Sequence, residues 1–283
     1  MENTFRRIIC LSVLLAVFPA CERFEMRGFI MSYESANRRF EQSMEWNSRH
    51  PHKEINASSE EYSIFAMGDS HVGATVNLDR FFDEAAAAGA AAVVMAGDIT
   101  DGRAEDYDLF KRHLPAEGSL NYFMITGNHD LYFDGWKQFY SLFGSSSYIF
   151  TVRTPQSADL FICTDTGGGT LGKDQLEWLK DILKNERPGY RHCVLFTHNN
   201  LFRIRHTSST NPNVEELRVM MELCIEHRID MVVSGHDHKK NVVKFGGTTH
   251  ITMDALKDGY EDAGYLVLDI GPDSPAYEFV QLR

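Results

Sequence analysis

The chain has 283 residues, of which 43% are hydrophobic and 24% are charged, so it can bury a sizeable core and is not disordered throughout. Its formal net charge of −12 argues against binding nucleic acid or an anionic membrane through a broad basic face. The acidic balance does not exclude a phosphate-bearing substrate, because bound metal cations can reverse the local field.

Residues 1–21 are predicted to be a signal peptide that ends at a candidate lipid-attachment site. Arg6 and Arg7 precede an apolar run over residues 8–18, which is shorter than the roughly 20 residues that span a bilayer. A basic start and a short apolar run are typical of export signals. The residues up to Cys21 resemble a bacterial lipoprotein box. We therefore expect an exported lipoprotein, periplasmic or at the cell surface, with the lipid on Cys21 as its only membrane contact; the alternative is a cleaved, soluble secreted or periplasmic form.

Three cysteines remain beyond the predicted signal, namely Cys163, Cys193 and Cys224. The first two lie in apolar strand-like runs and the third lies in a helical pattern, so buried free thiols are the preferred interpretation. One disulfide stays open, since sequence does not give distances between cysteines.

Residues 22–60 are predicted to be an N-terminal extension, with a short helix within 33–46 and a loop over 48–59. Residues 61–283 are predicted to be one domain, in which apolar runs indicate strands and helical periodicity indicates helices. The predicted strands cover 62–67, 91–96, 121–125, 148–152, 160–165, 192–197, 231–234, 242–245, 250–253, 265–270 and 277–282. The predicted helices cover 77–89, 104–113, 134–143, 173–186 and 215–227, the last with Asn213 as its N-cap. This order predicts parallel strands with crossover helices first and an antiparallel section at the end.

Five polar blocks each close an apolar run that is predicted to be a strand. They lie at residues 68–71, 97–101, 126–130, 197–200 and 235–238. In open α/β sheets, binding sites lie beyond the carboxyl ends of the strands, so we expect the five blocks to form one site.

Two of these blocks carry a pair of possible ligands at a spacing of two. Asp69 and His71 form one pair, and His236 and His238 form the other. In extended backbone, residues i and i+2 face the same way, so each pair can reach one metal ion. Two imidazoles that point together are unusual in a core, which favours metal ligation.

The other blocks add one candidate ligand each. Asp98 has two carboxylate oxygens and can bridge two cations at the separation of about 3.5–4 Å that two-metal hydrolysis uses. Asn128 offers an amide oxygen and His198 offers an imidazole. The mixed nitrogen and oxygen donors, without a thiolate, suit Mn, Fe, Zn or Co better than an all-oxygen Mg or Ca cage.

The ordered set of blocks resembles the calcineurin-like metallophosphoesterase superfamily, in the branch that includes class III cyclic-nucleotide phosphodiesterases. The matching motifs are Asp69-x-His71, Gly97-Asp98-x-x-Asp101, Gly127-Asn128-His129-Asp130, His198 and Gly235-His236-x-His238. The resemblance implies an α/β fold, a four-layer αββα sandwich with two mixed β-sheets and a metal site at the carboxyl ends of the strands. It also implies two divalent or trivalent transition metal ions.

The resemblance further implies a role for each site residue. One metal ion would be held by Asp69, His71, Asp98 and His238, and the other by Asp98, Asn128, His198 and His236. A hydroxide between the ions would attack phosphorus. His129 would be catalytic, by stabilising the phosphoryl group or protonating the leaving oxygen, and Asp101 would orient it. Asp130 would either support the site from outside or close the turn.

At two positions the sequence differs from related branches of the superfamily, and each difference argues against one kind of site. Gly102 stands where the protein-phosphatase branch has an arginine, and Asp101 stands where purple acid phosphatases have a tyrosine ligand. Neither phosphoprotein recognition of that type nor a coloured iron site is therefore expected. Arg203, Arg205 and His206 are interpreted as solvated loop charges in preference to phosphate contacts.

The implied function is metal-dependent hydrolysis of a small phosphorylated substrate, as a phosphodiesterase or a phosphomonoesterase. Two alternatives are a non-catalytic interaction module on the same fold and a nuclease. No expected ligand is missing, which argues against the first alternative. The chain is acidic and its sequence shows no obvious DNA-binding domain, so no nucleic-acid partner is expected. The sequence leaves the substrate, the metal and the oligomeric state open.

Overall fold

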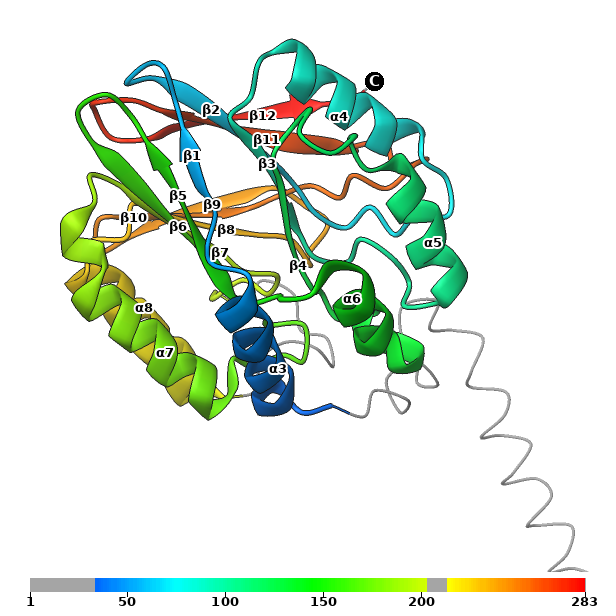
Figure 1. Cartoon of the computed structure of the whole chain (residues 1–283), viewed down its shortest axis with the longest axis horizontal. Helices are drawn as coiled ribbons and strands as arrows, with labels where there is room; N and C mark the ends of the chain where they lie inside the picture. Colours follow the sequence, from blue (N-terminus) through cyan, green and yellow to red (C-terminus); the bar gives the residue numbers. More distant parts are fainter. Residues whose placement is uncertain (1–33, 203–212, 283) are drawn as a thin grey trace, which may run out of the picture.

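A computed structural model describes residues 34–202 and 213–282, whose strands form two mixed sheets that face each other (Figure 1). The larger sheet has the order β1-β5-β6-β7-β8-β10-β9 and the smaller has the order β12-β11-β2-β3-β4. The strands of the larger sheet are β1 (Glu54–Asn56), β5 (Tyr148–Arg153), β6 (Ala158–Cys163), β7 (Cys193–Phe196), β8 (Met231–Ser234), β9 (Asn241–Phe245) and β10 (Thr248–Thr252). Those of the smaller sheet are β2 (Tyr62–Met67), β3 (Ala92–Ala96), β4 (Tyr122–Ile125), β11 (Gly264–Ile270) and β12 (Ala276–Gln281).

Helices cover the outer face of each sheet, which confirms the predicted sandwich. They are α3 (Ala36–Arg49), α4 (Val76–Ala87), α5 (Ala104–His113), α6 (Gly135–Phe143), α7 (Gly172–Asn185) and α8 (Val214–Glu226), together with the short 3-10 turns η2 (His129–Asp134) and η3 (Arg187–Gly189). Side chains from α4, α5 and α6 pack on the smaller sheet, and side chains from α7 and α8 pack on the larger one. Figure 1 shows α7 and α8 on one side of the paired sheets and α4 and α5 on the other.

The alternation of side chains along β2 explains the layers. Ile64 and Ala66 belong to the buried cluster between the sheets, whereas Phe65 and Met67 belong to the cluster under the helices. Both faces are therefore apolar, as expected for strands that are covered on two sides. Phe123 of β4 stacks on Phe150 of β5 with ring centroids 3.7 Å apart, which joins the two sheets directly.

The segment before residue 61 takes part in this packing. The short helix predicted within 33–46 is α3, but the stretch over 48–59 that was predicted to be a loop contains β1. Three residues with one buried side chain, Ile55, carry too weak a pattern to indicate a strand. Pairing with β5 in parallel is what extends them. The division into an extension and a domain at residue 61 stays a prediction.

Several smaller predictions are confirmed. Asn213 caps α8, because its side chain accepts a hydrogen bond from the backbone N–H of Glu216 at 3.2 Å. Cys163, Cys193 and Cys224 are buried free thiols, and burial raises the pKa of each.

Two sets of predictions fall outside the described residues. The signal peptide and Cys21 lie in residues 1–33, and Arg203, Arg205 and His206 lie in residues 203–212. Export, lipidation and the loop charges therefore stay predictions. Within the described residues, no helix combines the length and the apolar character needed to cross a bilayer.

Candidate metal centre

The five polar blocks meet at one edge of the molecule because the strands before them are neighbours. β2, β3 and β4 run parallel in the smaller sheet, and β7 and β8 run parallel in the larger one. Backbone hydrogen bonds then tie the loops together. The N–H of Asp69 donates to the carbonyl of Gly97 at 3.0 Å, and the N–H of Gly235 donates to the carbonyl of His198 at 3.1 Å.

The first group of possible metal ligands consists of Asp69, His71, Asp98 and His238, whose ligand atoms all lie within 4.8 Å of one another. The Nε2 atoms of His71 and His238 face each other at 3.3 Å, and His238 Nε2 is 3.2 Å from Asp69 Oδ1. Imidazole nitrogens and carboxylate oxygens this close together could hold a metal ion.

The second group consists of Asp98, His198 and His236, again within 4.8 Å. Asn128 completes it, because its Oδ1 lies 3.2 Å from His198 Nε2 and 2.9 Å from His236 Nδ1. His198 Nδ1 lies 2.9 Å from the carbonyl of Ala96, to which it donates, so its Nε2 is the atom left to bind a metal. The structure thus brings together all seven residues that were predicted to be metal ligands.

Asp98 is common to both groups, as predicted for a bridging carboxylate. Its Oδ2 is 3.8 Å from His71 Nε2 of the first group and 3.4 Å from His198 Nε2 of the second. Its Oδ1 accepts the backbone N–H of His129 at 2.7 Å, which fixes the orientation of the carboxylate. One oxygen is therefore held between the two clusters.

Asp101 and His129, the predicted catalytic pair, lie beside the first group. His129 Nδ1 lies 3.1 Å from Asp101 Oδ1, and the ring of His129 meets that of His71 edge-on at 4.4 Å. The side chain of His129 is 27% exposed, so solvent reaches this residue. The same Asp101 oxygen also lies 2.8 Å from Nδ1 of His71, a contact that sequence reasoning did not predict.

The backbone at the site differs from the extended form that was expected. Asp69, His71, Asp98, His236 and His238 all have positive φ, between 41° and 71°. This left-handed conformation costs roughly 1–2 kcal/mol for a residue with a side chain, and such strain collects at functional sites. Tight turns, not strand alternation, bring Asp69 and His71 into one group, whereas His236 and His238 fall in different groups, so the expectation that each pair reaches one ion holds for the first pair alone.

Burial and charge oppose each other in this cluster. Burial raises the pKa of the Asp98 carboxyl, but His198 and His129 outweigh it and hold that pKa well below its usual range. Burial lowers the pKa of His198, yet Asp98 outweighs that effect and raises it to about 10. The buried carboxylates are thus stabilised by nearby positive charge, which protons on the histidines or bound metal cations can supply.

Asp130 supports the site through hydrogen bonds to two of its loops. Its buried carboxylate accepts hydrogen bonds from the N–H groups of Gly127 and Thr100, both at 2.8 Å, and from the Thr100 hydroxyl at 3.0 Å. It therefore ties the loop that carries Asp98 to the loop that carries Asn128. The contacts show both roles left open for Asp130, since the bond from Gly127 closes the turn and the bonds from Thr100 tie it to the neighbouring loop.

One aromatic residue at this site carried no signal in the sequence. Tyr260 is 43% exposed, and its ring lies 5.8 Å from that of His238. Lys257 Nζ lies 6.0 Å from the same ring. A Gly-Tyr pair after Lys257 and Asp258 is ordinary turn composition, so only its place beside the cluster distinguishes it.

Comparison with known proteins agrees with this geometry. Residues 62–240 match the model of the family described as calcineurin-like phosphoesterase. Similar solved structures include GAP50, the anchor in the inner membrane complex of Plasmodium (14% identity, TM-score 0.62, 78% of this chain and 84% of that one). A dimetal phosphatase from Danio rerio is similar at 13% identity and a TM-score of 0.59, over 78% of this chain and 96% of that one.

A third similar structure is a putative 5'-nucleotidase from Staphylococcus aureus, at 13% identity and a TM-score of 0.53. The match covers 78% of this chain but 54% of that one. At these identities the likeness shows the fold alone. No curated protein sequence matches the chain.

Proposed function

Because the chain belongs to the calcineurin-like phosphoesterase family, whose model matches residues 62–240, we propose that it hydrolyses small phosphate esters at a centre of two metal ions. The family and the clusters of histidine and aspartate make the chain a metal-dependent hydrolase of phosphate esters. The number of ions and the role of each ligand are the parts that we add.

Asp98 is the observation that carries the proposal of two ions. A site for one ion would need only one of the two groups that meet at Asp98. Each group nevertheless adds three donors of its own to Asp98, namely Asp69, His71 and His238 in the first and Asn128, His198 and His236 in the second. Asp98 Oδ2 lies within 3.8 Å of an imidazole nitrogen of each group. A carboxylate oxygen in this position fits a ligand shared by two cations.

We assign Asp69, His71, Asp98 and His238 to one ion, and Asp98, Asn128, His198 and His236 to the other. When bound, the ions would lower the pKa of water and neutralise charge on the phosphoryl oxygens. Asp130 ties the loop of Asp98 to the loop of Asn128, and backbone hydrogen bonds link Asp69 to Gly97 and Gly235 to His198, so these hydrogen bonds hold the donor loops in place.

We assign His129 the proton-transfer role. Asp101 holds its Nδ1, which leaves Nε2 to donate a proton to the leaving oxygen or a hydrogen bond to the phosphoryl group. The net charge of −12 supports a small phosphorylated substrate over a nucleic acid, since a long polyanion would meet repulsion around the site.

The proposal is tested by metal analysis and turnover of the purified chain. With Mn, Fe, Zn or Co supplied, we expect about two ions per chain and hydrolysis of p-nitrophenyl phosphate or its bis-ester. Asp98→Asn should lose bound metal and reduce turnover by about 1,000-fold or more. Asp83→Asn, on the exposed face of α4, is the matched control and should change neither. Turnover that persists without metal, or an active Asp98→Asn variant with one ion, would refute the two-ion centre.

A further inference from the structure

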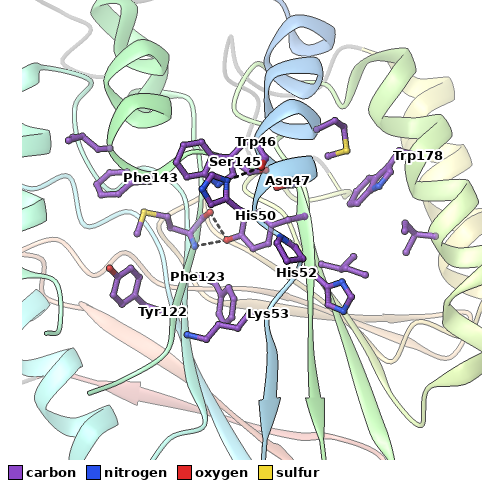
Figure 2. Close-up of a pocket in the computed structure, with 17 residues that line it drawn as sticks. Trp46, Asn47, His50, His52, Lys53, Tyr122, Phe123, Phe143, Ser145 and Trp178 are labelled. Atoms are coloured by element: carbon purple, nitrogen blue, oxygen red, sulfur yellow. Dashed lines mark hydrogen bonds between the residues drawn. The ribbon is translucent and has the colours of Figure 1, made fainter. Parts of the chain in front are cut away.

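A second cavity lies away from the metal centre, where the open edges of the two sheets meet below α3. Figure 2 shows its lining, which comes from α3 and the loop after it, from β4 and β5, and from α6 and α7. Its volume is about 550 Å³, within the range of roughly 300–1,000 Å³ that small-molecule sites have. None of the proposed metal ligands lines it.

Aromatic side chains from several elements contribute to the wall. They are Trp46, Tyr122, Phe123, Phe143, Tyr148 and Trp178, and all of them except Tyr148 are labelled in Figure 2. Trp46 stacks on His50 with ring centroids 4.1 Å apart and planes 13° apart, which fixes the ring at the edge of the cavity. Aromatic rings that line a cavity of this size favour a ligand with a ring of its own, which can pack against their free faces and edges.

The polar groups inside the cavity already have partners. The Tyr148 hydroxyl accepts the N–H of Met124 and donates to its carbonyl, both at 2.8 Å. Asn47 Nδ2 donates to the carbonyl of Ser147 at 2.8 Å. These two groups keep their protein partners when a ligand displaces water, whereas His50, His52 and Lys53 leave part of the wall polar.

Charge at the cavity is of one sign. Lys53 lines it together with His50 and His52, and no aspartate or glutamate does, in a chain whose net charge is −12. The carboxylates nearest in sequence are engaged elsewhere: Glu54 pairs with Arg153 at 2.8 Å, and Glu45 pairs with Arg49 at 3.2 Å. Within the described residues, the Lys53 ammonium makes no hydrogen bond and no ion pair.

From this combination we propose that the cavity is a binding site for an aromatic carboxylate, separate from the phosphoesterase centre. The ring system of the ligand packs against the aromatic side chains, and its carboxylate meets Lys53 at the edge of the cavity. Aromatic rings beside an unpaired lysine, with no carboxylate in the wall, favour a ligand that joins a ring to one anionic group, since a neutral ring leaves Lys53 unpaired and a cationic one is repelled.

The proposal is tested by calorimetric titration of the purified chain with 2-naphthoate, against the neutral 2-naphthalenemethanol. We expect naphthoate to bind more tightly than the alcohol. Lys53→Ala should weaken naphthoate by about five-fold and leave the alcohol unchanged. Lys111→Ala, an exposed lysine on α5, is the matched control and should alter neither titration.

A second variant tests the cavity itself. Ile182 lines it from α7 and is half-buried, so Ile182→Trp should fill the space and abolish binding of both compounds, with the fold checked by circular dichroism. Phosphoester turnover should be normal in both variants, which separates this proposal from the function of the metal centre. Equal binding of acid and alcohol to the unmodified chain, no effect of Lys53→Ala, or no binding of naphthoate at millimolar concentration would each overturn the proposal.

Discussion

At the residue scale, one carboxylate oxygen connects the proposed ligands with the proposed acid. Asp101 Oδ1 lies 2.8 Å from His71 Nδ1 and 3.1 Å from His129 Nδ1. A histidine ligand whose second nitrogen is held by a carboxylate is oriented and made more basic. Asp101 is therefore expected to act on metal binding through His71 and on proton transfer through His129, whereas the sequence assigned it the second task alone.

Replacing His129 and replacing Asp101 should have different effects on turnover and on metal binding. His129→Ala should reduce turnover by about 100- to 10,000-fold with metal content unchanged, because it removes proton transfer but no ligand. Asp101→Asn should reduce turnover and also weaken metal affinity by about 10-fold or more, since His71 loses its partner. Metal titration beside steady-state kinetics distinguishes them. If Asp101→Asn keeps full metal affinity, the contact between Asp101 and His71 does not contribute to metal binding.

Residue types and spacing could predict the site because the ligands are chemically distinctive. All seven predicted ligands converge, and His129 lies beside them. What spacing could not predict is the path of the backbone. The left-handed turns at Asp69 and His71 are set by hydrogen bonds to the neighbouring 97–101 loop, such as that from the N–H of His71 to the carbonyl of Asp98 at 3.0 Å. Tyr260 was missed for the same reason, since only tertiary structure brings it to His238.

At the scale of elements, α3 is held to the domain by a buried ion pair. Arg39 Nε and Nη2 donate to the two oxygens of Asp165, at 2.7 and 3.1 Å, and both side chains are almost fully buried. Trp136 of α6 adds a hydrogen bond from its Nε1 to Gln42 Oε1 at 2.6 Å. The periodicity of α3 predicted a helix, but no local pattern could show that Arg39 has a partner 126 positions away.

Removing one member of this pair should destabilise the whole fold. Arg39→Ala leaves the Asp165 carboxylate buried without its partner, which typically costs 3–5 kcal/mol. The neighbouring Arg38→Ala removes an exposed pair with Glu41, which solvent screens, and should change the stability little. Unfolding in urea measures both free energies. Equal, small losses in the two variants would mean that α3 contributes little to the stability of the domain.

At the scale of the whole molecule, each proposed ion takes ligands from both sheets. Asp69, His71, Asp98 and Asn128 follow strands of the smaller sheet, whereas His198, His236 and His238 follow strands of the larger one. The first group combines three residues from the smaller sheet with His238, and the second combines Asp98 and Asn128 with two histidines. Bound metal would therefore link the two sheets at the edge where the buried carboxylates otherwise rely on protonated histidines for positive charge.

Metal removal should consequently lower the stability of the entire domain. An ion that binds only the folded state at about 100 times its Kd adds roughly 2.7 kcal/mol, which in a chain of this size corresponds to a shift of about 5–10 °C in Tm. Differential scanning calorimetry before and after chelation measures the shift, and restoring the metal should reverse it. Asp98→Asn, which lacks the shared ligand, should lose most of the response, whereas Asp83→Asn should keep it. A Tm that is the same with and without metal would show that the ions do not bind the folded chain in preference to the unfolded chain, and that the centre does not hold the two sheets together.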